Sequence, residues 1–155
     1  MKYVFIFLAI ILSGSAMSQT IIHRDKEIDQ MVKEVNKDTL TKYIDKLVSF
    51  GTRNTLSTQS NNARGIGAAR NWVLQKFNEY SKQSNNKLSA YIDTVTYPAD
   101  GKRVDRKIIL GNVVAILKGT DTSDKRIFVI SGHLDDMRTN VMDSVADAPG
   151  ANDDA

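Results

Sequence analysis

The sequence predicts an α/β fold, the N-terminal part of a sandwich in which helices pack against a mixed β-sheet. Two helical patterns come early, over residues 38–51 and 63–81. Two strand-like segments follow at 88–97 and 104–117, and then a short apolar segment at 126–131. Helices followed by strands, one of them apolar on both faces, indicate a layered domain with a covered sheet.

The first helical segments are predicted by the spacing of their apolar residues. Residues 21–36 carry scattered apolar side chains, which is consistent with a short amphipathic helix. In the next segment Asp38 is the expected N-cap and Gly51 the expected stop. The apolar stripe between them has the spacing i, i+3, i+4, i+7 and i+8 and consists of Leu40, Tyr43, Ile44, Leu47 and Val48.

The longest helical pattern covers residues 63–81, where apolar residues share one face. Gly65 and Gly67 each weaken a helix by about 1 kcal/mol relative to Ala, so we expect the helix to begin near Ile66. The polar run 84–86 is expected to end it.

The strand-like segments are predicted by residue type and by the turns between them. Residues 88–97 alternate and are rich in strand-forming side chains, and a turn follows at Pro98 to Gly101. Residues 104–117 form one long strand or two. Residues 126–131 are predicted to be a buried strand, and residues 136–149 an ordered loop without periodicity.

The first eighteen residues have the layout of a signal peptide. Lys2 gives a positive start, residues 3–12 are apolar, and residues 13–18 are small. We expect cleavage between Ser18 and Gln19, and therefore a protein that is exported to the periplasm or secreted. An uncleaved membrane anchor is the alternative, although ten apolar residues are short for a span. A lipobox is excluded because the chain has no Cys.

The amino-acid composition limits the classes of protein to which the chain can belong. Residues 19–155 suffice for one domain, and the absence of Cys excludes disulfides despite export. The 21 basic residues nearly balance the 18 acidic ones, so the formal charge is only +3. The sequence also has no basic stripe with interleaved aromatic residues. We therefore expect no nucleic-acid partner and no membrane span after signal cleavage.

The residues that suggest chemistry follow the apolar segment 127–130. His133 comes directly after Gly132, and a neutral imidazole at a strand end is a good zinc ligand. Asp135, two residues on, lies on the same side of an extended chain and can reach the ring. Asp153 follows a tight turn that begins at Pro149. On the residues alone, His133 bonded to a carbonyl and Asp135 in solvent remain alternatives.

These motifs resemble the M28 family of zinc aminopeptidases. The family pattern is a Gly-His-x-Asp strand end and a later Pro-Gly-Ala-x-Asp-Asp-x-Ser-Gly loop. The resemblance covers residues 38–155, with upstream similarity that is weak by itself. The matching segments are 50–53, 65–77, 112–119, 132–135 and 149–155.

The resemblance implies a sandwich of the zinc-peptidase (phosphorylase/hydrolase-like) type and a site with two Zn²⁺ ions. His133 and Asp153 would be metal ligands, with Asp153 bridging the two ions, and Asp135 would orient His133 as a catalytic residue. The substrate would be a peptide that loses its N-terminal residue. The family's general base and remaining ligands come later in sequence. We therefore expect residues 19–155 to be the N-terminal portion of the catalytic domain, inactive alone.

Several other functions fit the same residues. A glutaminyl cyclase-like enzyme uses one zinc ion, but its loop usually reads Ala-Thr-Asp-Ser. A carboxypeptidase or dipeptidase is possible, as is a non-catalytic product that binds metal or a partner protein. Neither motif specifies the preferred N-terminal residue or an oligomeric state.

The layout of the first eighteen residues generates the first prediction. Exported protein is expected to begin at Gln19, because the small residues Ala16 and Ser18 fit the cleavage pattern. N-terminal sequencing or intact mass of the exported fraction measures this. Exported protein that still begins at Met1 would contradict cleavage.

Overall fold

The computed structural model describes residues 24–150 of the chain. The predicted signal segment, residues 1–18, and the predicted ligand Asp153 lie outside this range. The chain divides into two compact units, with the division between Asn36 and Lys37.

The first unit contributes one described helix, α2, over Lys26–Glu34. The Oδ1 atom of Asp25 accepts hydrogen bonds from the backbone N–H groups of Glu27 at 2.8 Å and Ile28 at 3.4 Å. This cap satisfies donors that have no partner within the first turn. The predicted helix between residues 21 and 36 is thus confirmed over its described part, and none of its residues is buried.

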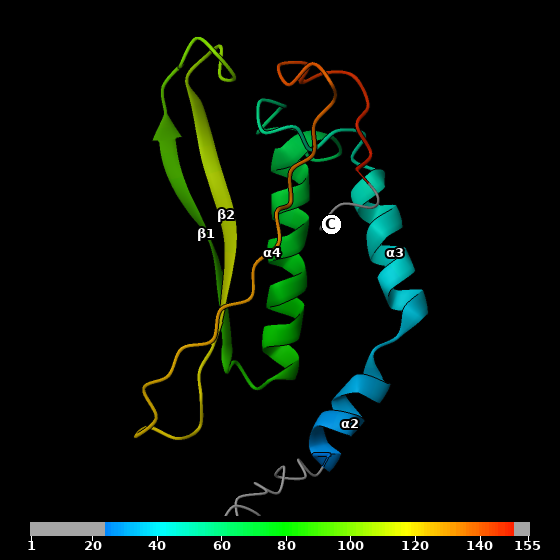
Figure 1. The fold of residues 1–155 in the computed structure, drawn as a ribbon, viewed down its shortest axis with the longest axis vertical. Helices are drawn as coiled ribbons and strands as arrows, with labels where there is room; N and C mark the ends of the chain where they lie inside the picture. Colours follow the sequence, from blue (N-terminus) through cyan, green and yellow to red (C-terminus); the bar gives the residue numbers. More distant parts are fainter. Residues whose placement is uncertain (1–23, 151–155) are drawn as a thin grey trace, which may run out of the picture. The chain divides into compact units, whose positions relative to one another are not determined.

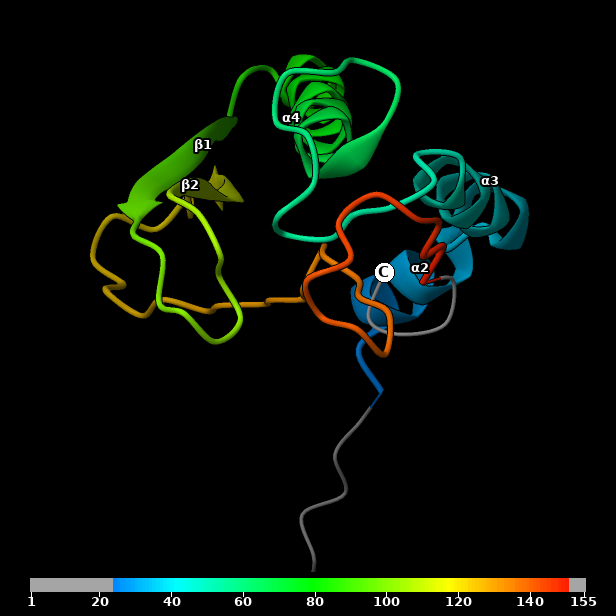
Figure 2. The same cartoon turned by 90° about the horizontal axis from the view of Figure 1, so that it is seen from above.

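The elements of the second unit are α3 (Lys37–Val48), α4 (Gly65–Gln83), β1 (Leu88–Tyr97) and β2 (Ile108–Leu117) (Figure 1). The two strands form an antiparallel pair in which Leu88 lies opposite Leu117 and Tyr97 opposite Ile108. Helix α4 packs against both strands, and Figure 2 shows it end-on beside the pair. The α/β class is therefore confirmed, with residues 108–117 as one continuous strand.

Local sequence accounts for most of these bounds. Helix α3 begins at Lys37, so Asp38 lies in the first turn and is not the N-cap that we predicted. Its charge still interacts favourably with the positive end of the helix dipole. Gly51 has a φ of +72° just after α3, a conformation that glycine adopts without steric cost. The predicted stop is confirmed.

The core of the second unit lies where the end of α3 meets the first half of α4. Its buried members are Leu47, Phe50, Ala68 and Ala69. Two partly buried side chains pack against them, and one of these is Leu134, which comes from the segment predicted to carry the site. The hydrophobic core therefore fixes the chain between His133 and Asp135.

The predicted buried strand at residues 126–131 is wrong for the structure described. Residues 127–130 are neither paired nor covered, and their side chains are between 82% and 100% exposed. A central strand needs neighbours on both edges and apolar cover on both faces. The described residues form only the β1–β2 pair, which leaves residues 126–131 outside it. The mixed-sheet sandwich remains an expectation.

Residues 136–149 form the predicted loop, which contains no helix and only one bridge, the parallel contact between Thr52 and Ala148. The backbone N–H of Ala148 donates to the carbonyl of Gly51 at 2.8 Å. The loop is thus held against the chain that follows α3. Across residues 24–150, no helix has the length and apolar character needed to cross a bilayer.

The start of α4 generates a prediction on stability. A Cβ added at Gly67 would lie 2.2 Å from the carbonyl oxygen of Gln59. Gly→Ala in an open helix gains about 1 kcal/mol, but here the clash with backbone opposes that gain. We expect Gly67→Ala to lower the free energy of unfolding by about 1–3 kcal/mol, measured by urea denaturation.

Gly119→Ala is the matched control, because a Cβ at Gly119 meets no atom within 4 Å. Its free energy of unfolding is expected to stay within about 0.5 kcal/mol of the parent. A Gly67→Ala protein as stable as this control would mean that residues 57–59 move aside without cost.

Candidate metal centre

A buried arginine, Arg53, organises the region around the predicted site. Its side chain is 1% exposed, and the residue comes shortly after the C-terminal end of α3. The Nε–H donates to the carbonyl of Leu134 at 2.8 Å, and an Nη1–H donates to the carbonyl of Leu47 at 3.1 Å. The guanidinium therefore joins the end of α3 to the residue between His133 and Asp135.

The same guanidinium also holds the start of the second motif. An Nη1–H donates to the carbonyl of Pro149 at 2.9 Å, and an Nη2–H donates to the carbonyl of Gly150 at 3.0 Å. Gly150 has a φ of +48°, and a Cβ there would lie 3.0 Å from Nη2. The two motifs, separate in sequence, are joined through one side chain.

Asp136 compensates the buried charge. Its Oδ2 lies 3.4 Å from Nη1 of Arg53, and its Oδ1 accepts the backbone N–H of Arg53 at 2.8 Å. Burial raises the pKa of the Asp136 carboxyl, while the N–H bond and the charge of Arg53 act in the opposite direction. Acidic side chains in irregular loops are usually solvated, but that of Asp136 is only 6% exposed.

His133 and Asp135 lie together at the surface, and their side chains are 42% and 50% exposed. Nδ1 of His133 is 2.8 Å from the backbone carbonyl oxygen of Asp135 and 3.5 Å from its Oδ1. Because a carbonyl only accepts hydrogen bonds, Nδ1 carries the proton and Nε2 the lone pair in the neutral ring. The Asp135 carboxylate is near the His133 ring, as predicted, but the backbone carbonyl of Asp135 lies nearer to Nδ1.

Thr55 fixes the Asp135 carboxylate. The Oγ1–H donates to Oδ2 of Asp135 at 2.6 Å, from the loop between α3 and α4. The carboxylate therefore has a fixed orientation beside the imidazole. No local pattern predicts this role of Thr55, because its partner is 80 residues away along the chain.

His133 fits the chemistry of a zinc ligand. Neutral imidazole binds zinc through one nitrogen, while the other N–H is commonly held by a carbonyl or carboxylate. Here Nδ1 makes that bond, so Nε2 is the ring nitrogen that would bind a metal ion. Within residues 24–150, no three His, Asp or Glu side chains are grouped to hold a metal ion. The proposed bridging ligand Asp153 lies outside those residues.

The remaining described acids of this loop have structural partners. Asp143 accepts the backbone N–H groups of Ala146 at 3.0 Å and Val145 at 3.2 Å. These two bonds, in that order, lower the pKa of its carboxyl. Asp147 forms an exposed ion pair with Arg64 at 2.6 Å. Neither contact involves His133.

Two further arginines hold the middle of the same loop. Arg64, at the start of α4, donates from Nη2 to the carbonyl of Val145 at 2.6 Å. Arg106, just before β2, donates from Nη2 to Oγ of Ser144 at 3.0 Å and to the carbonyl of Leu56 at 2.5 Å. Arginines from three parts of the second unit thus fix a loop that has no helix or strand.

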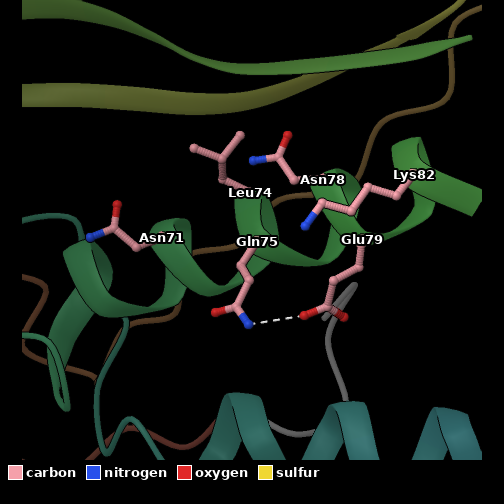
Figure 3. A pocket seen from close by; sticks show the side chains of 6 residues that line it. All are labelled: Asn71, Leu74, Gln75, Asn78, Glu79 and Lys82. Atoms are coloured by element: carbon pink, nitrogen blue, oxygen red, sulfur yellow. Dashed lines mark hydrogen bonds between the residues drawn. The ribbon is translucent and has the colours of Figure 1, made fainter. Parts of the chain in front are cut away.

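Two hollows lie on the second unit. The larger, about 430 Å³, runs along α4 (Figure 3). Its acidic side chain, Glu79, accepts hydrogen bonds from Gln75 at 2.9 Å and Lys76 at 2.6 Å. The smaller, about 280 Å³, includes Asp135 and Asp136 in its lining. Only the smaller hollow adjoins a predicted site residue.

Comparison with known proteins finds homologues of the chain. Its homologues are named probable zinc metalloproteases. No protein-family model matches the chain, and no solved structure matches it.

The homologues named here are fungal and much longer than the chain. The chain is 40% identical to one from Leptosphaeria maculans, over 84% of the chain and 30% of that protein. It is 39% identical to one from Phaeosphaeria nodorum, over 90% of the chain and 28% of the relative. One from Pyricularia oryzae is 40% identical, over 84% and 26%. The chain thus spans less than a third of these relatives' length.

The contrast between two acids generates a prediction. Asp136→Ala leaves the buried guanidinium of Arg53 without its counter-charge, so the free energy of unfolding is expected to fall by about 3–5 kcal/mol. Asp147→Ala removes an exposed pair in the same loop and is expected to cost less than about 1 kcal/mol. Urea denaturation of both variants measures the difference. Equal losses would show that the Arg53–Asp136 contact has no special weight.

Proposed function

We propose that the protein containing this chain is a zinc metallopeptidase, and more narrowly an aminopeptidase of the M28 type with two zinc ions. The observation that carries the proposal is the similarity, over 84% of the chain, to proteins named probable zinc metalloproteases. The arrangement of His133 and Asp135 supports it, since the carbonyl of Asp135 holds Nδ1 of the ring, as is common for a zinc-binding imidazole.

Each residue has a defined role in this proposal. His133 would hold zinc through Nε2, while the carbonyl of Asp135 holds its Nδ1–H and fixes the plane of the ring. The Asp135 carboxylate, held by Thr55, provides negative charge beside the imidazole. Asp153 would be a further ligand of the metal site, as the M28 resemblance implies. Zinc, when bound, supplies Lewis acidity toward water and toward the peptide carbonyl.

The proposed substrate is a peptide with a free N-terminus, and the proposed location is outside the cytoplasm. The substrate class follows from the protease homologues, and the aminopeptidase specificity follows from the M28 resemblance. Export follows from the signal-peptide layout of residues 1–18.

Two variants of the full-length protein test the site. His133→Ala is expected to lose one zinc equivalent and peptidase turnover, because the nitrogen ligand is removed. Asp135→Asn keeps the backbone carbonyl and loses the charge, so zinc affinity is expected to fall by about 10- to 100-fold. Metal content by mass spectrometry and turnover of aminoacyl p-nitroanilides measure both effects.

Asp147→Asn is the control, because Asp147 lies in the same loop and pairs with Arg64. It should retain the zinc content and turnover of the parent. A His133→Ala protein with the zinc content and turnover rate of the parent would show that His133 is not part of the metal site. One zinc ion per parent molecule, with cyclisation of N-terminal glutamine and no peptide hydrolysis, would favour the glutaminyl cyclase alternative.

A further inference from the structure

We propose that Arg53 is a positioning residue for the metal site, which sets the segment from His133 to Asp135 at a fixed distance from Pro149 and Gly150. This inference rests on the proposed function, since it concerns the position of the proposed zinc ligand His133. It assigns a role in metal affinity to a side chain that contacts no metal.

The geometry of the guanidinium supports this role. Its N–H groups donate to carbonyls on both sides of the site, at Leu134 and at Pro149 and Gly150, at 2.8 to 3.0 Å. Leu134 lies between His133 and Asp135, and Gly150 lies three residues before Asp153. A planar guanidinium holds several acceptors in a fixed arrangement, which an ammonium cannot reproduce. Arg53 therefore couples the segment that carries His133 directly to the start of the second motif.

Among residues 24–150, few other contacts join these two ends of the loop. The segment between Leu134 and Pro149 has no helix or strand, so no regular ladder of hydrogen bonds within it sets the separation of its ends. The bridge between Thr52 and Ala148 holds only the later end. Asp136 binds Arg53 through backbone and side chain, and so fixes the earlier end to the same residue.

Arg64 and Arg106 provide the comparison. Both contact the same loop, at residues 144, 145 and 147, but their contacts with it do not include residues 134, 149 or 150. Removing either loosens the middle of the loop and leaves the Arg53 contacts in place. A general effect of loop anchoring would therefore appear in all three arginine variants, and a positioning effect only at Arg53.

The test measures zinc affinity of the full-length protein by competition with a chromophoric chelator. Arg53→Gln and Arg53→Lys are compared with Arg64→Gln and Arg106→Gln, and circular dichroism establishes that each variant is folded. Zinc affinity is expected to fall by about 10- to 100-fold in Arg53→Gln, as for other residues that orient ligands. Arg53→Lys is expected to recover part of the loss, and the two controls to stay within about threefold of the parent.

A second measurement covers an Arg53 variant that fails to fold. Hydrogen exchange of the parent protein is followed with and without zinc. We expect zinc to slow exchange at the amides of Asp136 and Ala148 together, because Arg53 joins their segments. Protection of one segment alone would overturn the inference.

The outcomes separate this inference from the proposed function. A parent protein that binds no zinc would overturn the proposed function. A parent that binds zinc, with Arg53 variants that bind it as well as the Arg64 and Arg106 variants do, would overturn the positioning role alone.

Discussion

The arrangement of the second unit depends on the burial of one positive charge. Arg53 is 1% exposed, and such a charge is stable only where hydrogen bonds and a counter-charge replace water. Here four carbonyl bonds and Asp136 provide them. Because the acceptors come from three separate stretches of chain, satisfying the guanidinium also brings those stretches together. The hydrophobic core, which includes Phe50 and touches Leu134, supports the same junction.

Those features of the fold that depend on neighbours in sequence were predictable. The helices, the stop at Gly51, strand β1 and the irregular loop follow from periodicity and turn chemistry, which act over a few residues. The strand expected at residues 126–131 failed because a strand also requires partners, and no other strand in the described part pairs with it. Apolar character alone does not specify pairing.

In the candidate site, too, local sequence predicts some features, while others depend on residues far apart in the chain. His133 and Asp135 are neighbours, and their spacing predicts that ring and carboxylate lie near each other, as they do. Asp136 and Asp147 look alike as loop acids, yet one is buried and the other exposed. What distinguishes them is the position of Arg53 and Arg64, whose contacts span more than 80 residues. No local pattern carries that information.

The exposed segment 127–130 has a consequence for the solubility of newly made protein. Four consecutive apolar residues with high β-propensity can pair with the same segment of another copy. Charged residues stand immediately before it, at Asp124, Lys125 and Arg126, and such gatekeepers oppose that pairing. Because collisions between copies become more frequent with concentration, the yield of native protein is expected to fall as the rate of synthesis rises.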